Sequence, residues 1–158
     1  MSYVEELFNL KNKVILVTGA CGQLGSEICK AFVSSGSIVV GVDLNVENKQ
    51  LGGVDYYELD ATNKTKKQKI YKAIIKKYGA IDVLVNNAGV STFKDFEDRT
   101  EEAFDWVVDV NLKGVFFDIQ TYVNLFDEHG SQQGSIINIG STYGVVSPDF
   151  RNYTDLPR

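Results

Sequence analysis

The chain has 158 residues, of which 44% are hydrophobic and 23% are charged. This composition is typical of one globular domain with a sizeable core and indicates neither a disordered nor a fibrous protein. The formal net charge of −5 argues against nucleic acid as the main partner, because nucleic-acid binding needs a concentrated basic surface.

No targeting or membrane segment is evident in the sequence. The first ten residues lack the basic region that opens a secretory signal, and no apolar run approaches the length of a membrane span. We therefore expect a cytoplasmic protein without a membrane partner. The two cysteines, Cys21 and Cys29, do not form a disulfide framework, and we interpret both as small packing residues. The alternative for Cys21 is an oxidisable thiol near a bound phosphate.

Short apolar runs alternate with helical stripes along the whole chain. This alternation is typical of parallel strands joined by right-handed crossovers, so we predict an α/β fold with a doubly wound parallel sheet. We predict the strand order 3-2-1-4-5 in a single domain over residues 1–158, with the fifth strand left as an open edge. Strands are predicted at 13–17, 37–42, 54–59, 81–85 and 135–139, and helices at 23–35, 63–78 and 101–128, with a short turn near 93–97.

A glycine-rich segment connects the first predicted strand to the first predicted helix. A sharp turn from strand to helix directs backbone N–H groups and the positive end of a helix dipole at one point, where a pyrophosphate can bind. Glycines permit the close approach that this binding needs. We therefore predict a dinucleotide site whose binding residues here are Thr18, Gly19, Gly22, Gln23, Leu24 and Gly25.

Asp43 follows the second predicted strand, eighteen residues after Gly25. A carboxylate at this place can accept hydrogen bonds from the adenosine ribose hydroxyls and would repel a 2′-phosphate. Residues 44–46 contain no Arg or Lys, which supports the same preference. We therefore predict NAD as the cofactor in preference to NADP. The alternative is that Asp43 merely ends a strand.

Residues 63–77 carry seven lysines and no acidic residue. The lysines alternate with apolar residues at helical spacing, so we interpret them as the solvated face of an amphipathic helix. The alternative, a nucleic-acid patch, has no accompanying motif.

The long predicted helix at 101–128 has an unusually wide apolar stripe. Two interpretations are open: the helix is buried against the sheet, or part of the stripe meets a partner subunit. The stripe contains Phe104, Val108, Leu112, Val115, Ile119, Val123 and Phe126, and is widened by Phe116 and Phe117.

Further motifs follow the glycine segment in chain order. They are Leu59-Asp60-Ala61, Asn86-Asn87-Ala88-Gly89, Val110-Asn111-Leu112-Lys113-Gly114 and Asn138-Ile139-Gly140-Ser141. Over nearly the whole chain this set resembles the short-chain dehydrogenase/reductase family, and the Asn-Asn-Ala-Gly segment is its most specific part. The resemblance implies a Rossmann-like fold. It also implies an NAD-dependent oxidoreductase that transfers a hydride between the nicotinamide and an alcohol or carbonyl substrate.

The resemblance implies further contacts with the cofactor. Asp60 and Ala61 would border the adenine, while Asn87, Ala88 and Gly89 would support the central strand and the cofactor wall. The simpler alternative for Asn87 is a turn-forming residue after a strand.

Two catalytic roles are implied in the same way. Ser141 would orient the substrate carbonyl, and a hydroxyl there makes physical sense because negative charge develops on that oxygen during reduction. Asn111 would anchor a water molecule in a proton relay. The alternative for Asn111, within a helix, is a polar side chain that caps its own backbone. With one histidine and two cysteines, the sequence supports no metal site.

The glycine spacing departs from the pattern of the common oxidoreductase branch. Gln23 occupies the position of the middle glycine, and the spacing Gly19, Gly22, Gly25 is closer to the extended branch of nucleotide-sugar epimerases and dehydratases. The Asn-Asn-Ala-Gly segment and the region around Ser141 resemble the common branch, to which we give the greater weight.

A second departure concerns the family's proton donor, a Tyr followed four residues later by a Lys. Tyr153 lies twelve residues after Ser141, but Pro157 stands where the Lys would be, and Tyr143 is only two residues from Ser141. A Tyr needs a neighbouring ammonium to act as an acid near neutral pH. We therefore expect the catalytic Tyr and Lys, and the substrate loop, to lie beyond residue 158, and this chain alone to be inactive.

Two hypotheses for function follow. The first is the cofactor-binding portion of an NAD-dependent oxidoreductase that acts on a small alcohol or carbonyl compound, such as a sugar derivative, and whose full-length form is a homo-oligomer. The alternative is a non-catalytic nucleotide-binding remnant.

Overall fold

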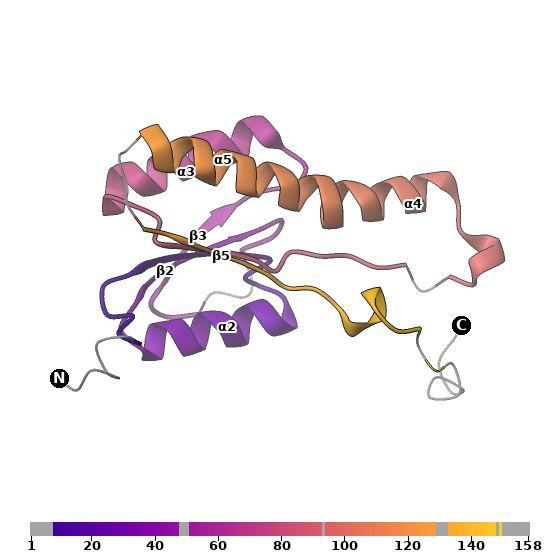
Figure 1. Ribbon diagram of the computed structural model, residues 1–158, viewed down its shortest axis with the longest axis horizontal. Helices are drawn as coiled ribbons and strands as arrows, with labels where there is room; N and C mark the ends of the chain where they lie inside the picture. The colour runs from indigo at the N-terminus through magenta and orange to yellow at the C-terminus, as the bar shows by residue number, and fades with distance from the viewer. Residues whose placement is uncertain (1–7, 48–50, 93, 129–132, 148, 150–158) are drawn as a thin grey trace.

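Five parallel strands form one sheet in the order β3-β2-β1-β4-β5 (Figure 1), which confirms the predicted fold class and strand order. The computed structural model describes residues 8–47, 51–92, 94–128, 133–147 and 149. The strands are β1 (Val14–Thr18), β2 (Ile38–Asp43), β3 (Val54–Glu58), β4 (Val83–Asn86) and β5 (Ser135–Asn138).

Helices cover both faces of this sheet (Figure 1). Helix α2 lies on one face, whereas α3 and α5 lie on the other, and α4 continues the line of α5 beyond the sheet. The α-helices are α2 (Gln23–Ser34), α3 (Lys64–Tyr78), α4 (Glu101–Val108) and α5 (Val115–Glu128); shorter helical segments are η1 (Phe96–Asp98), η2 (Asp109–Gly114) and η3 (Thr142–Gly144).

The central strand β1 is buried along its whole length. On the α2 face Ile15 and Val17 belong to one apolar cluster with Cys29, while on the other face Leu16 belongs to a second cluster with Tyr71 of α3. A strand that is covered on both faces reads as a continuous apolar run, which is why β1 is evident in the sequence. Both cysteines are buried, as predicted for packing residues.

The predicted continuous helix at 101–128 is wrong in its middle. A π-helical segment, η2, separates α4 from α5. Asn111 and Gly114 lie within η2, and Gly114 is a poorer helix former than the residues around it. The Asn111 side chain forms two hydrogen bonds with the backbone of Val90, and these tertiary bonds stabilise the irregular turn. The predicted turn near 93–97 corresponds to η1, which begins later.

The prediction that the lysines of residues 63–77 form a solvated face is wrong at Lys67. This side chain is fully buried and its Nζ lies 2.9 Å from Asp118 Oδ1 in α5. Lys67 precedes Tyr71 by one helical turn, so both lie on the face of α3 that packs inward. Other lysines of the helix form surface ion pairs: Lys66 with Glu58, Lys72 with Glu128 and Lys77 with Asp55.

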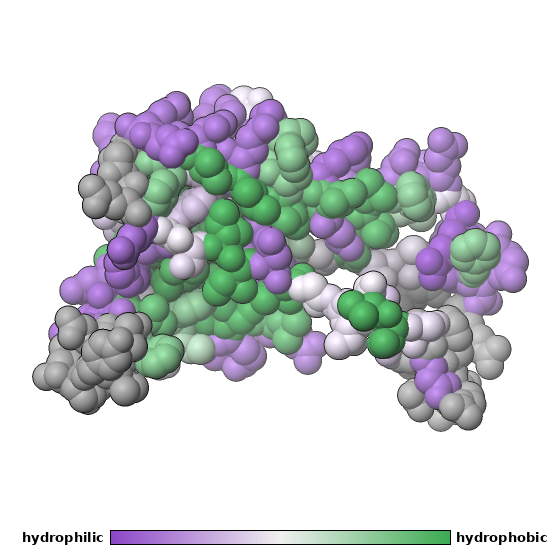
Figure 2. All heavy atoms as spheres, viewed as in Figure 1, coloured by the Kyte–Doolittle hydropathy of each residue, from purple (hydrophilic) through white to green (hydrophobic). Residues whose placement is uncertain are grey.

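Apolar side chains remain exposed along α4, η2, α5 and β5 (Figure 2). Phe104, Leu112 and Phe116 are 66%, 65% and 58% exposed, whereas Tyr122 and Leu125 of the same helical line are buried against the sheet. All four residues of the edge strand β5 are exposed. The core contact at the carboxyl end of α5 is thus made by Tyr122 and Leu125, which lie outside the predicted stripe, whereas Val123 of the stripe is exposed there. No helix in the described ranges is long and apolar enough to cross a membrane.

Candidate dinucleotide-binding site

The turn between β1 and α2 brings the chain into unusually close contact with itself. Gly19 has a φ of 64°, and a Cβ on it would lie 2.8 Å from Ala88 Cα. A Cβ on Gly25 would overlap the Gly19 carbonyl oxygen. Only glycine at position 25 lets α2 approach the end of β1 this closely, and only glycine at position 19 lets the end of β1 approach the segment after β4. These approaches place the amino end of α2 at the carboxyl edge of the sheet.

The first turn of α2 is suited to an anion. Gly22 precedes the helix without a side-chain cap, and the first turn contains no acidic residue. The first N–H groups of an α-helix have no partner within the helix, and the helix dipole adds partial positive charge there. Gln23 and Leu24 are exposed at this end and line a cleft.

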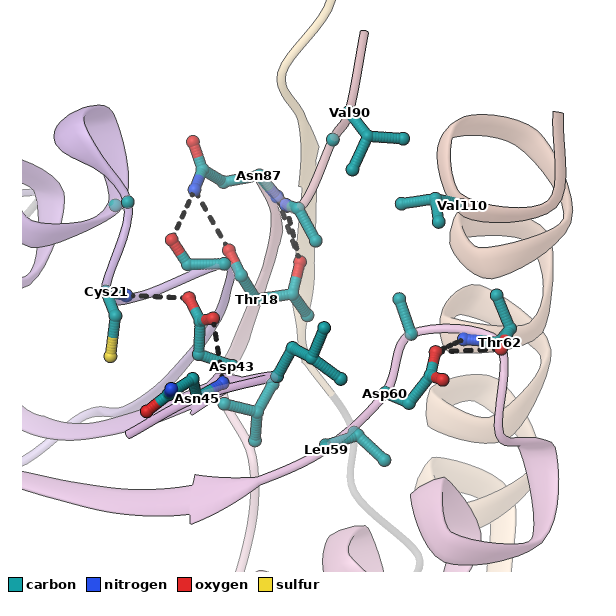
Figure 3. Close-up of a pocket in the computed structure, with 18 of the residues that line it drawn as sticks. Thr18, Cys21, Asp43, Asn45, Leu59, Asp60, Thr62, Asn87, Val90 and Val110 are labelled. Atoms are coloured by element: carbon teal, nitrogen blue, oxygen red, sulfur yellow. Dashed lines mark hydrogen bonds between the residues drawn. The ribbon is translucent and has the colours of Figure 1, made fainter. Parts of the chain in front are cut away.

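Asp43 connects the end of β2 to the glycine turn (Figure 3). Its Oδ2 accepts a hydrogen bond of 2.9 Å from the Cys21 N–H, and its Oδ1 accepts a longer one of 3.4 Å from the Asn45 N–H. These bonds fix the carboxylate at the cleft wall, where Leu44 also lies. The residue therefore does more than end a strand: it holds the glycine turn against β2.

Thr18 and Asn87 join the ends of β1 and β4. The Thr18 hydroxyl oxygen accepts hydrogen bonds from the N–H groups of Asn87 and Ala88, at 3.1 and 3.0 Å. The Asn87 amide donates in return to the carbonyls of Thr18 and Gly19, at 3.0 and 3.1 Å (Figure 3). Asn87 is thus not a simple turn former, because its side chain closes the glycine turn from the opposite side.

Asp60, Ala61 and Gly89 also line the cleft. Asp60 Oδ1 accepts bonds from the N–H and hydroxyl of Thr62, at 2.8 and 2.7 Å, which orders the loop after β3. Across the cleft from this loop stands Val110 of η2 (Figure 3).

The two predicted catalytic residues are placed differently. Asn111 Oδ1 accepts a bond from the Val90 N–H and its Nδ2 donates to the Val90 carbonyl, both at 2.8 Å. The alternative that Asn111 caps its own helix is therefore wrong. Ser141 follows β5, and its Oγ accepts a bond of 3.1 Å from the Tyr143 N–H. Ser141 does not line the described cleft, and Tyr153 falls outside the described residues.

The residues described above, apart from Asn111, Ser141 and Tyr143, line a cleft of about 1110 Å³ at the carboxyl ends of the strands. This volume exceeds the usual range for drug-sized ligands, so a dinucleotide can be accommodated. Open α/β sheets bind ligands at this edge, where the strand order reverses. Within the described ranges, no cluster of His, Cys, Asp and Glu could hold a metal ion.

Sequence reasoning missed one wall of the cleft, formed by α4 and η2. The lining residues that these two segments contribute are spaced at i, i+3, i+4, i+7 and i+8, which places them on one helical face. That periodicity was the signal available in the sequence. The additional lining residues are Glu102, Asp105, Trp106, Asp109 and Val110.

Comparison with known proteins identifies the family. The family model described as short chain dehydrogenase matches residues 13–154. The chain belongs to the short chain dehydrogenase family. The chain is 35% identical to the 3-oxoacyl-[acyl-carrier-protein] reductase FabG of Thermotoga maritima, over 91% of the chain and 62% of that relative. It is 32% identical to the NAD-dependent glycerol dehydrogenase of Listeria innocua, over 90% of the chain and 58% of that protein.

Solved structures give the same result. A short chain dehydrogenase from Leptospira borgpetersenii with bound NAD+ superposes with a TM-score of 0.83 at 34% identity, covering 96% of this chain and 59% of that one. The aldohexose dehydrogenase of Thermoplasma acidophilum superposes with a TM-score of 0.76 at 32% identity, covering 84% and 50%. The chain thus spans about three fifths of the curated relatives and half to three fifths of these two structures.

Proposed function

We propose that this chain is the NAD(H)-binding portion of an oxidoreductase that transfers a hydride between the cofactor and a small alcohol or carbonyl compound. The observation that carries the proposal is the position of the Asp43 carboxylate in the cleft wall. Its carboxylate is fixed by the Cys21 N–H at the cleft wall. The residues that follow it in the wall, Leu44 and Asn45, carry no positive charge to neutralise a 2′-phosphate. A fixed carboxylate favours the two free ribose hydroxyls of NAD(H) over NADP(H).

The residues present fit such a cofactor. The pyrophosphate would bind the first N–H groups of α2, beside Gly22, Gln23 and Leu24, where a side chain on Gly19 or Gly25 would disrupt the turn. The adenine would lie between the loop at Asp60 and Ala61 and the helical wall, while Thr18 and the segment 87–89 would support the opposite part of the dinucleotide. When bound, the nicotinamide supplies the hydride acceptor or donor.

Ser141 and Asn111 are our proposed catalytic residues. The Ser141 oxygen accepts a bond from the Tyr143 N–H, and among the described residues the Ser141 hydroxyl proton has no acceptor. That proton can therefore be donated to a substrate oxygen on which negative charge develops. Each half of the Asn111 amide retains one further hydrogen-bonding position beyond Val90, which suits the proposed relay water.

The substrate class is supported by the names of the relatives. Galactitol 2-dehydrogenase of Agrobacterium fabrum is 31% identical and D-threitol dehydrogenase of Mycolicibacterium smegmatis 32% identical to this chain. Both names denote sugar alcohols, so we propose a small polyol or its carbonyl counterpart as the substrate. We propose separately that the full-length protein is a homo-oligomer and that it is cytoplasmic. Names of this kind do not favour an epimerase, a dehydratase or a non-catalytic remnant.

The cofactor assignment is tested by titrating the chain and its Asp43→Asn variant with NADH and NADPH. Asparagine keeps an oxygen for the Cys21 N–H but removes the charge. We expect the parent to bind NADH at least tenfold more tightly than NADPH, a difference of about 1.4 kcal/mol, and the variant to lose most of that ratio.

Glu58→Gln is the matched control for the loss of charge. Glu58 ends β3 and pairs with Lys66 at the surface, outside the cleft. This variant should keep the parent's preference for NADH. Equal affinities of the parent for the two cofactors, or an unchanged ratio in Asp43→Asn, would remove the role proposed for Asp43.

A further inference from the structure

Three polar side chains form a buried cluster between α3 and α5. Lys67 and Tyr71 come from α3 and Asp118 comes from α5, and each is almost completely buried. The Lys67 ammonium lies 2.9 Å from Asp118 Oδ1, and the Tyr71 hydroxyl donates a hydrogen bond to the same oxygen. The pair is therefore desolvated, and its charges are compensated only by one another and by nearby polar groups.

The ammonium of Lys67 has a second acceptor that connects the cluster to η2. It donates a 2.9 Å hydrogen bond to the carbonyl of Gly114, the last residue of the π-helical segment. Gly114 also lies against the loop after β3, since a Cβ on it would be 3.4 Å from the Ala61 carbonyl oxygen. Asn111 attaches the same segment to Val90 through two bonds. Thus η2 is held from three sides.

This segment supplies part of the cofactor cleft. Asp109 and Val110 line it, as does Asp118 of α5. A π-helical turn is rare and departs from the regular bonding of the helices that flank it, so its geometry depends on tertiary contacts. Val110 of η2 faces the loop that carries Asp60 (Figure 3). Any shift of η2 therefore moves Val110 relative to that loop.

Stability alone does not require such a cluster. Well-packed apolar residues of similar volume often stabilise a protein as much as a buried ion pair or more. We propose that Lys67, held by Asp118 and Tyr71, is a positioning residue that fixes η2 and thereby sets the spacing of the cleft walls. The consequence for cofactor affinity rests on the function proposed above; the effect on η2 does not.

The test replaces the whole cluster by apolar residues. Lys67→Met alone would leave Asp118 as an unpaired buried charge and unfold the protein, so the informative variant is Lys67→Met/Tyr71→Phe/Asp118→Leu. Lys69→Met is the matched control, because Lys69 is exposed on the same helix. Thermal unfolding, hydrogen exchange of the Val90 amide and the Kd for NADH are measured on the 158-residue chain.

We expect the triple variant to unfold within a few degrees of the parent, while its Val90 amide exchanges about tenfold faster. The Kd for NADH should rise about fivefold, and Lys69→Met should match the parent in all three measurements. A stable triple variant with the parent's exchange rate overturns the proposal. So does a triple variant that cannot fold, since the cluster would then serve folding itself. If the parent fails to bind NADH, the proposed function fails, and the Val90 exchange rate still decides this inference.

Discussion

Replacing Thr18 by valine separates the hydrogen bonds of this side chain from its packing. Valine has nearly the same shape, so the variant leaves no cavity. The N–H groups of Asn87 and Ala88 lose their acceptor, and the Val85 carbonyl loses a weaker donor at 3.4 Å. Both N–H groups are only partly buried, so water can replace some of what is lost.

An unsatisfied buried donor costs about 1–3 kcal/mol. With two partly buried donors, we expect Thr18→Val to lower the free energy of unfolding by about 3 kcal/mol. For a chain of this length, each kcal/mol corresponds to roughly 2–4 °C, so the melting temperature should fall by roughly 6–12 °C. Thermal unfolding followed by circular dichroism measures this shift.

Thr121→Val provides a control with the opposite expected sign. Thr121 is as buried as Thr18, but its hydroxyl oxygen has no hydrogen-bond partner among the described residues. The same substitution there removes an unpartnered polar group and should leave stability equal or raise it by up to about 1 kcal/mol. If the two variants melt at the same temperature, the hydrogen bonds of Thr18 do not stabilise the junction of β1 with β4.

Two further predictions concern the glycine turn and a buried thiol. Gly25→Ala should lower the free energy of unfolding, measured by thermal unfolding, by more than about 3 kcal/mol, because its Cβ would overlap the Gly19 carbonyl oxygen. Gly140→Ala is the control: its Cβ would meet open space, so it should change stability by less than about 0.5 kcal/mol. Burial raises the pKa of Cys29 from 9.0 to about 11. The unfolded chain then releases this proton first as the pH rises. The stability difference between the parent and Cys29→Ala, measured by urea unfolding, should therefore shrink by about 2 kcal/mol between pH 9 and pH 11; a constant difference would contradict the shift.

The strands were predictable because a central parallel strand is covered on both faces and must be apolar throughout. The run in β1 and the glycines that follow it satisfy local requirements that are visible in a short window of sequence. The position of Asp43 was predictable for a similar reason, since it depends only on the length of one β-α-β unit. Its bond to the Cys21 N–H was not, because that bond depends on how the turn folds back on β2.

Lys67 shows where local patterns are insufficient. Its spacing from Tyr71 and Ile74 places it on the buried face of α3, but a lysine among seven in one helix reads as solvated. The partner that makes its burial tolerable, Asp118, lies 51 residues later in the sequence, outside any local window around Lys67. The π-helical turn was missed for the same reason: its contact with Val90 joins two distant segments.

The contacts that order the cleft also stabilise the fold, which constrains any experiment on this site. Thr18 and Asn87 hold β1 to β4 by hydrogen bonds, and Asp43 holds the glycine turn to β2 in the same way. A binding assay alone cannot distinguish a lost cofactor contact from the loss of stability that follows when one of these bonds is removed. Truncation to alanine would lower affinity for a cofactor even if no residue touched it. Substitutions that preserve shape and the shorter hydrogen bond but change charge, such as Asp43→Asn, are therefore the ones whose effect on affinity can be assigned to the cofactor itself.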